Sequence, residues 1–480
     1  MVHAVELVDA VLDPGSFISW DEPIDLKGLP ESYRTSLIQA AEKSGVDEAV
    51  ITGSGQIDGR TVAVIVNEFG FLAGSVGSRA ADRVLDAISR ATAERLPLLA
   101  STCSGGTRMQ EGTPAFVKMA PIARAITEHK AAGLPYLVYL RHPTTGGVFA
   151  SWGSLGHITA AEPAALTGFL GPRVFEALNG VPFPPGVQVS DRLATRGVID
   201  GVLPDHELRD AVAKVLALML DPPTEPSRER RPAAGDGSSE GALDTGVWAN
   251  IESTRAAGRP GLRELLQHGS DSTVFLSGTG TGERNPAVAV ALARLDGVPC
   301  VVVGHDRAAE VDTPLGPAGL RQAQRGMRLA EELNLPLVTV VDTAGADLSE
   351  EAEMGALAGE IARTLAHLTT LRIRTVGVLL GQGCGGGALA LLPAQTVIAT
   401  ERSWLSPLPP EGASAILFGT TDRAGDMARR QRVGAMDLAA DGIVHHVVAE
   451  RPHDDSAALC AAVAAEVSAR LRGEGHEQLR

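Results

Sequence analysis

The chain contains the glycine-rich stretch Ser104-Gly105-Gly106-Thr107, which is followed downstream by Thr144-Thr145-Gly146-Gly147. The second half of the chain has a matching pair, Asp342-Thr343-Ala344-Gly345 and Gly383-Cys384-Gly385-Gly386-Gly387. Gly105 and Gly146 are 41 residues apart, as are Gly345 and Gly386, and the halves are offset by 240 at both landmarks (345 − 105 and 386 − 146). A repeat of this length predicts a duplicated domain and not a solenoid.

Each glycine-rich stretch comes directly after a short apolar segment that reads as a buried strand. These segments are 96–100, 134–140, 335–341 and 375–380. Helical spacing of apolar residues separates them, and the predicted helices are 80–93, 114–130, 206–220, 320–333 and 456–471. Strands that alternate with helices predict an α/β fold in which β-α units wrap around a mostly parallel sheet.

Four segments follow from this alternation. Residues 1–48 are predicted to be an N-terminal accessory segment, and 49–220 the first domain. Residues 221–246 are mainly Pro, Gly, Ser and charged residues, which predicts a linker. Residues 247–480 then form the second domain.

Composition excludes several classes of protein. The net charge of −16 argues against a nucleic-acid binder. The four cysteines form no C-x-x-C pair, so we expect neither structural zinc nor a disulfide framework, no metal site, and a reducing cytoplasm. We see no signal peptide, and no apolar run reaches the roughly 18 residues of a membrane span.

Glycine turns at strand ends can bind a developing negative charge. A strand that ends in Gly-Gly and leads into a helix presents backbone N–H groups, which attract an anion or an oxyanion. Two such turns can converge into an oxyanion hole, so two halves would supply two of them. The alternative is that these glycines only permit tight turns and close helix–sheet packing.

Other chemistry-bearing residues have structural interpretations that we favour. Cys384 could be a nucleophile in an electropositive turn, but a small packing residue fits as well. Arg108 and Glu111 are expected to pair and order their loop. Similar structural or surface roles are predicted for His142, His157, His445 and His446. Three arginines lie on one predicted helix face that could bind phosphates or be solvated: Arg321, Arg325 and Arg328.

The motifs resemble a known family. Residues 50–60, 71–78, 104–112, 143–148 and 161–173 resemble the β subunit of bacterial acetyl-CoA carboxylase carboxyltransferase. Residues 316–319, 342–345, 381–390 and 406–416 resemble the α subunit. The chain is therefore similar to a fused β–α carboxyltransferase of the actinobacterial acyl-CoA carboxylase type.

The resemblance implies two tandem crotonase (ClpP-like) domains of β-β-α units. It implies transfer of a carboxyl group from carboxybiotin, on a separate carrier protein, to acetyl-CoA or a similar short acyl-CoA. The first domain would hold the acyl-CoA thioester and the second the biotin urea oxygen. The implied catalytic residues are Gly105, Gly106, Gly146, Gly147, Gly345, Gly386, Gly387 and Ala388, and the implied binding residues are Gly105, Gly106, Thr145, Gly146, Gly385, Gly386 and Gly387.

The resemblance also implies partners: a biotin carboxylase, a biotin carboxyl carrier protein and at least a second copy of the chain. Malonyl-CoA as product would place the protein in fatty acid biosynthesis. The chain departs from the family in lacking the four-cysteine zinc ribbon and in having Ala344-Gly345-Ala346-Asp347 where the family usually has Pro-Gly-Ala-Tyr. Three alternatives stay open: a malonyl-thioester or acyl-CoA decarboxylase on the same scaffold, a non-catalytic carboxylase subunit and, least favoured, a crotonase-type hydratase.

Overall fold

The computed structural model describes residues 2–226, 246–451 and 455–473. Its described part divides into two compact units: residues up to Ala217 with Gly280–Gly282, and the rest from Leu218 onward. Most of the predicted linker, 227–245, lies outside the described residues. Within the described ranges, every helix is too short or too polar to span a bilayer.

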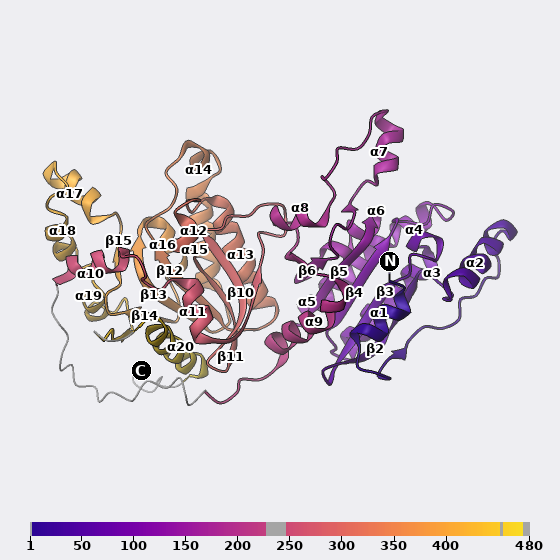
Figure 1. Cartoon of the computed structure of the whole chain (residues 1–480), viewed down its shortest axis with the longest axis horizontal. Coiled ribbons are helices and arrows are strands. Elements are labelled where there is room, and N and C mark those ends of the chain that lie inside the picture. The colour runs from indigo at the N-terminus through magenta and orange to yellow at the C-terminus, as the bar shows by residue number, and fades with distance from the viewer. Residues whose placement is uncertain (1, 227–245, 452–454, 474–480) are drawn as a thin grey trace. The chain divides into compact units, whose positions relative to one another are not determined.

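The first unit is one mixed sheet with helices packed on it (Figure 1). Its sheet order is β1-β2-β3-β4-β5-β6-β8, with β7 paired to β5. The strands are β1 (Ile18–Ser19), β2 (Val50–Ile57), β3 (Arg60–Asn67), β4 (Leu98–Ser104), β5 (Tyr136–Thr145), β6 (Ile158–Ala161), β7 (Thr167–Gly168) and β8 (Gly201–Val202). The helices are α1 (Ala4–Val11), α2 (Glu31–Ser44), η1 (Leu72–Gly74), α3 (Ser78–Ala93), α4 (Thr113–Val117), α5 (Met119–Ala131), α6 (Gly146–Phe149), η2 (Trp152–Ser154), α7 (Pro172–Asn179), α8 (Ser190–Thr195) and α9 (Asp205–Leu220).

The second unit repeats this plan. Its sheet order is β16-β14-β13-β12-β11-β10-β9, with β15 paired to β13. The strands are β9 (Ser270–Leu276), β10 (Val288–Leu295), β11 (Val298–His305), β12 (Leu337–Thr343), β13 (Thr375–Cys384), β14 (Thr396–Thr400), β15 (Trp404–Ser406) and β16 (His446–Val448). The helices are α10 (Gly246–Arg255), α11 (Leu262–Gly269), α12 (Arg307–Glu310), α13 (Pro317–Glu332), α14 (Glu350–Met354), α15 (Leu357–Thr370), α16 (Gly385–Leu391), α17 (Pro410–Phe418), α18 (Ala424–Arg430), α19 (Ala435–Ala440) and α20 (Ser456–Arg472).

A tight hairpin starts the sheet of each unit. Asp58-Gly59 joins β2 to β3 and Asp296-Gly297 joins β10 to β11, and all four residues have positive φ. Asp-Gly suits a two-residue turn of this kind, because both central positions need left-handed backbone. The later pairs, from β3 to β8 and from β11 to β16, are all parallel, as the alternation of strands and helices predicts.

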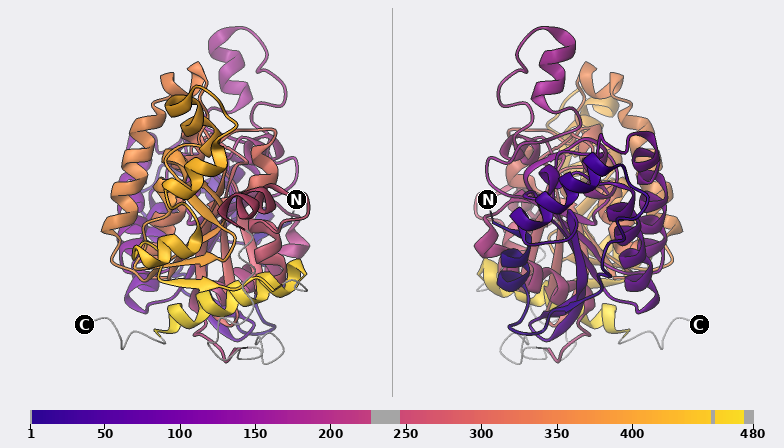
Figure 2. Two further views of the ribbon diagram at one scale, coloured as in Figure 1. Left: turned by 90° about the vertical axis from the view of Figure 1, so that its left-hand side faces the viewer. Right: turned by 90° about the vertical axis from the view of Figure 1, so that its right-hand side faces the viewer.

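The apolar core of each unit lies between its sheet and its helices. In the first unit, α3 and α5 place Val84, Ile88 and Ile122 against the strands. In the second, α11 and α20 pack against the strands, and α20 is the yellow helix of Figure 2 (left). Burial of these side chains away from water is the main stabilising contribution to each unit.

The structure corrects one expectation about segments. The helix predicted over 114–130 is two helices, α4 and α5, which meet at Lys118. Residues 1–48 pack on the first unit: Leu7 and Val8 of α1 are buried, and Tyr33 of α2 belongs to an apolar cluster with Phe71. Figure 2 (right) shows this indigo segment beside the strands of its own unit.

Candidate functional site

The two glycine turns of the first unit meet backbone to backbone. Strands β4 and β5 are parallel neighbours, and their register shifts between Thr102 and Ser104 just before the first turn. A β-carbon on Gly106 would lie 3.3 Å from the α-carbon of Gly146. Gly106 and Gly146 have φ of +104° and +64°, which glycine adopts without the penalty of a side chain. The structure therefore brings together the two turns that the sequence singled out.

The second unit forms the same pair of turns at the ends of β12 and β13. Gly345 and Gly385 have φ of +130° and +65°, close to the values of Gly106 and Gly146. The register shift recurs between Val341 and Thr343. The site glycines of each half are thus held by the same local architecture.

The offset between the halves is 239 at these turns, so the alignment at 240 was wrong by one residue. Strand β4 ends at Ser104 and β12 at Thr343, and α6 and α16 begin at Gly146 and Gly385. A bridge from Val76 to Thr107 likewise recurs from Leu315 to Ala346. Gly345 therefore corresponds to Gly106 and not to Gly105, and adjacent glycines in the sequence allowed either pairing.

Three of the four expected N–H donors in the first unit already have an acceptor inside the fold. Gly105 N donates to the Ala73 carbonyl at 2.9 Å, and Gly146 N to the Phe169 carbonyl at 2.9 Å. Gly106 N donates to Ser104 Oγ at 3.0 Å. Gly147 lies in the first turn of α6, where backbone N–H groups have no acceptor within the helix. Gly147 is therefore the donor best placed to face a ligand.

The space beside Gly147 is small. A β-carbon there would lie 3.0 Å from Thr107 Oγ1. In the second unit the corresponding residue is Gly386, and a β-carbon there would lie 3.0 Å from Ile361 Cδ1. Only glycine lets an acceptor atom approach the backbone at these positions.

The remaining expected site residues take supporting places. Thr145 is buried and its hydroxyl donates to the Ser104 carbonyl at 3.4 Å. Gly387 packs so closely that a β-carbon would lie 2.8 Å from Leu315 Cδ2, and Ala388 is fully buried in α16. These residues therefore pack against the turns and support their conformation.

Arg108 is fully buried beneath the first turn, and its principal partner was not foreseen. Its guanidinium forms an ion pair with Glu48, whose second oxygen lies 3.0 Å from Arg108 Nη1. The expected partner Glu111 is 3.7 Å away and accepts from the Tyr33 hydroxyl at 2.5 Å. The predicted structural role is confirmed, but Glu48 and Tyr33 come from the N-terminal segment, where no local pattern indicates them.

The histidines and arginines considered from the sequence have structural partners. The Nδ1 atoms of His142, His157 and His445 accept from backbone N–H groups at 2.9–3.0 Å, whereas the ring of His446 lies 3.7 Å from the Glu466 carboxylate. Arg321 pairs with Glu283 and Glu360, and Arg325 donates to backbone carbonyls. Burial lowers the pKa of the Arg328 guanidinium.

Cys384 ends β13 and is buried, and burial raises the pKa of its thiol to about 11. At neutral pH it is therefore a thiol and not a thiolate, which argues against a nucleophile. Within the described ranges, no group of three His, Cys, Asp or Glu side chains could hold a metal ion.

One carboxylate at the second turn was missed. Glu310 ends α12, and its Oε1 accepts from the Thr343 hydroxyl at 2.5 Å. Burial raises the pKa of Glu310 to about 7. Its sequence neighbours carry no motif, so only the fold could bring it to the turn.

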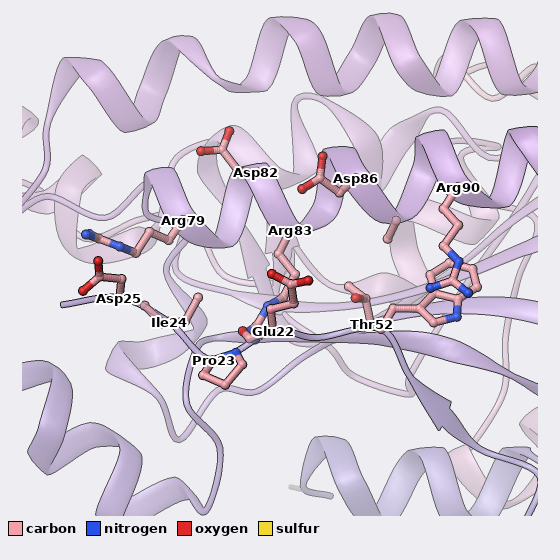
Figure 3. Close-up of a pocket in the computed structure, with 12 residues that line it drawn as sticks. Glu22, Pro23, Ile24, Asp25, Thr52, Arg79, Asp82, Arg83, Asp86 and Arg90 are labelled. Carbon is pink, nitrogen blue, oxygen red and sulfur yellow. The ribbon is translucent and has the colours of Figure 1, made fainter. Parts of the chain in front are cut away.

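A surface pocket of about 420 Å³ lies in the first unit, away from the glycine turns (Figure 3). Acidic and basic side chains of α3, among them Asp82, Asp86 and Arg90, line it opposite the segment from Glu22 to Asp25. Arg83 pairs there with Asp21 and Asp47. Both carboxylate and guanidinium groups therefore line this pocket.

Comparison with known proteins places the whole chain. The carboxyl transferase domain family matches residues 2–465. The probable biotin-dependent acyl-coenzyme A carboxylase beta3 subunit of Mycobacterium tuberculosis is 51% identical over 482 residues, which cover 99% of this chain and 96% of the relative. The acetyl-coenzyme A carboxylase carboxyl transferase subunits beta/alpha of Saccharopolyspora erythraea are 36% identical over 97% of this chain and 83% of the relative.

Solved structures support the fold. Transcarboxylase 12S, solved as a hexamer with hydrolyzed methylmalonyl-coenzyme A bound, matches with a TM-score of 0.78 and 20% identity over 100% of this chain and 91% of that chain. A single-chain, multi-domain long-chain acyl-CoA carboxylase matches with a TM-score of 0.74 over 96% of this chain. Both units therefore have the crotonase-like fold that the motifs implied, and this chain belongs to the carboxyl transferase family as a carboxyltransferase subunit of the biotin-dependent acyl-CoA carboxylases.

Proposed function

We propose that the protein transfers the carboxyl group of carboxybiotin, carried on a separate protein, to acetyl-CoA and so forms malonyl-CoA. The observation that carries this proposal is the pair of equivalent glycine turns, one in each unit, with Gly147 and Gly386 in matching places. Two oxyanions need stabilising in such a reaction, the enolate of the acyl-CoA and the urea oxygen of biotin, and two equivalent turns supply one site for each.

The family resemblance suggests which unit binds which substrate. The Gly147 N–H would face the thioester oxygen of the acyl-CoA, and the Gly386 N–H would face the biotin urea oxygen. Carboxybiotin supplies the carboxyl group and, once that group has left, the base that takes the α-proton. The net reaction breaks an N–C bond, moves one proton from the α-carbon to the ureido nitrogen and forms one C–C bond. The chain contributes positioning and electrostatic stabilisation.

Acetyl-CoA is the acceptor we favour because the beta/alpha relatives carry that name. The relative with 51% identity is named for acyl-coenzyme A in general, so propionyl-CoA is the first competitor to measure. Malonyl-CoA as product would feed fatty acid biosynthesis. A cytoplasmic location stays a prediction.

We infer that the protein works with a biotin carboxylase and a carrier protein, as a homodimer or larger homo-oligomer. Large apolar side chains beside the turns support an oligomer: Met109 is 83% exposed, and Phe116 and Phe169 are also exposed in the first unit. In the second unit, Leu348 is 91% and Met354 79% exposed. Exposed apolar side chains gathered beside a site are typical of an interface. Light scattering after gel filtration measures the assembly, and a monomer would contradict this inference.

The reverse reaction tests the function. Purified protein is mixed with malonyl-CoA and biocytin, and release of acetyl-CoA is followed. Methylmalonyl-CoA, which would release propionyl-CoA, is tested in parallel. Biocytin-dependent release supports the carboxyltransferase, and the preferred substrate gives the acyl chain. Release without biocytin would indicate a decarboxylase. Absence of release with both substrates would favour the non-catalytic subunit, for which the altered 344–347 loop provides a reason.

A further inference from the structure

Glu310 holds three consecutive residues of the second glycine turn. Its Oε1 accepts from the Thr343 hydroxyl at 2.5 Å, and its carboxylate also accepts from the Ala344 backbone N–H. Thr343 Oγ1 in turn accepts from Gly345 N at 3.0 Å. The geometry of the turn at Gly345 therefore depends on one side chain that can gain or lose a proton.

The first unit builds the corresponding contacts without a titratable group. Ser104 Oγ donates to the Gly74 carbonyl at 2.6 Å, and Gly105 N donates to the Ala73 carbonyl at 2.9 Å. Gly106 N donates to Ser104 Oγ at 3.0 Å, as Gly345 N does to Thr343. Two backbone carbonyls thus stand in the first unit where a single carboxylate stands in the second.

The surroundings of Glu310 keep both of its protonation states accessible. Burial raises its pKa to about 7, the nearby charge of Asp342 on β12 acts in the same direction, and hydrogen bonds from Thr343 and Ala344 act against both. Arg307 of the same helix has its Nε 3.6 Å from Asp342 Oδ2. The charge of Glu310 also raises the pKa of the Cys384 thiol at the end of β13, so Cys384 stays neutral.

The Thr343 hydroxyl has a second acceptor available. Its Oγ1 lies 3.2 Å from the Gly345 carbonyl, and this contact competes with the one to Glu310. When Glu310 is ionised, the hydroxyl donates to the carboxylate. When Glu310 is protonated, its own O–H can donate to Thr343 Oγ1, and the threonine hydrogen turns toward Gly345. One proton thus reverses the direction of the hydrogen bonds across the turn.

We propose that Glu310 is a positioning residue for the biotin-side turn and that its ionised form sets the turn for carboxyl transfer. The ionised state reproduces the hydrogen bonds of the first unit, so it is the competent one. The glycine turn of the first unit is held by backbone carbonyls, so its geometry does not depend on the protonation of a side chain. This inference rests on the proposed function of the second unit.

The test compares wild type with Glu310→Gln between pH 5.5 and 8.5 in the reverse reaction with malonyl-CoA and biocytin. For wild type we expect kcat/KM for biocytin to rise with pH and level off above about pH 7. The amide of the Glu310→Gln variant is never ionised, so its profile should be flat and about tenfold below wild type at pH 8. The KM for malonyl-CoA should change little. Glu252→Gln, which alters an exposed carboxylate of α10 in the same unit, is the matched control and should follow wild type.

A second measurement needs no activity. Because the pKa of Glu310 is raised in the folded state, its contribution to stability is present below pH 4.5 and is lost as pH rises through 7. The melting temperature of wild type should therefore fall relative to Glu310→Gln between pH 5 and 8. If neither protein turns over malonyl-CoA or methylmalonyl-CoA, the proposed function fails and the melting data alone decide. The inference would be overturned if the melting temperatures of wild type and Glu310→Gln changed in parallel with pH. It would also be overturned if the rise of kcat/KM for biocytin near pH 7 persisted in Glu310→Gln.

Discussion

A β-carbon on Gly146 would lie 3.1 Å from the α-carbon of Gly106, which is closer than nine in ten β-carbon contacts in real proteins. The two turns of the first unit are therefore fixed by mutual contact and not only by their own conformations. The corresponding pair in the second unit is roomier, because a β-carbon on Gly385 would meet nothing closer than the Pro407 carbonyl at 3.6 Å.

This difference predicts unequal costs for one substitution in two places. Gly146 and Gly385 have φ of +64° and +65°, so Gly→Ala brings the same backbone strain of about 1–2 kcal/mol at both. Gly146→Ala adds overpacking of about 1–3 kcal/mol. Urea unfolding should show Gly146→Ala to be the less stable protein, and equal stabilities would contradict the close contact.

Substitutions at Gly147 and Gly386 should separate the two substrates. A methyl group at either place would keep the ligand oxygen from reaching the N–H that we assign to it, and an oxyanion that loses one such hydrogen bond reacts about 10²–10³ times more slowly. We expect Gly147→Ala to impair use of malonyl-CoA and Gly386→Ala to impair use of biocytin in the reverse reaction. Melting temperatures near wild type are the control, and identical effects on both substrates would argue against the assignment.

Glu48→Gln should be strongly destabilising. It would leave the Arg108 guanidinium without its carboxylate partner in a fully buried place, and breaking a buried ion pair costs about 3–5 kcal/mol. Glu128→Gln removes an exposed partner of Arg124 and should leave the denaturant midpoint almost unchanged. Denaturant midpoints of the two variants measure the difference between their losses of stability. That difference would vanish if the Arg108–Glu48 pair were solvated.

His129 should make the first unit less stable in mild acid. Burial lowers the pKa of His129 to about 4 from a usual 6.5. Its contribution to stability is therefore present above pH 6.5 and is lost as pH falls toward 4, by about 2 kcal/mol between pH 7 and 5. His129→Gln should lose less stability than wild type over that interval when unfolding is measured at both pH values.

All four cysteines should resist a thiol reagent in the folded protein. Cys103, Cys300, Cys384 and Cys460 are buried thiols outside any disulfide, and burial raises the pKa of each thiol to about 11 or 12. Titration with a chromogenic disulfide should give four thiols in denaturant and close to none under native conditions. Rapid native reaction of Cys384 would revive the nucleophile interpretation.

Local patterns in the sequence were enough to find the four strands that lead into the glycine turns, most of the longer helices and the four turns themselves. They did not find β2 and β10, although Asp58-Gly59 and Asp296-Gly297 each mark a hairpin. These local patterns also could not predict contacts between segments that are far apart in the sequence. Glu48 reaches Arg108 across 60 residues and Glu310 reaches Thr343 across 33, and no local periodicity encodes such pairs.

The offset error has a physical cause of the same kind. Where two glycines are adjacent, as at 105 and 106, the letters alone do not say which one takes positive φ. The sequence shows that a turn exists, whereas the register of the neighbouring strands decides which residue occupies each place in it.

The two apolar cores are separate along the chain, the first built from residues between Val50 and Val202 and the second from residues between Leu262 and Leu471. This arrangement suits vectorial synthesis, because domains fold as units during translation with the N-terminal one first. The first core is complete in sequence before the ribosome adds the first residue of the second. The first core can therefore form before the second set of apolar strands is synthesised, which limits mispairing between two sheets of the same design.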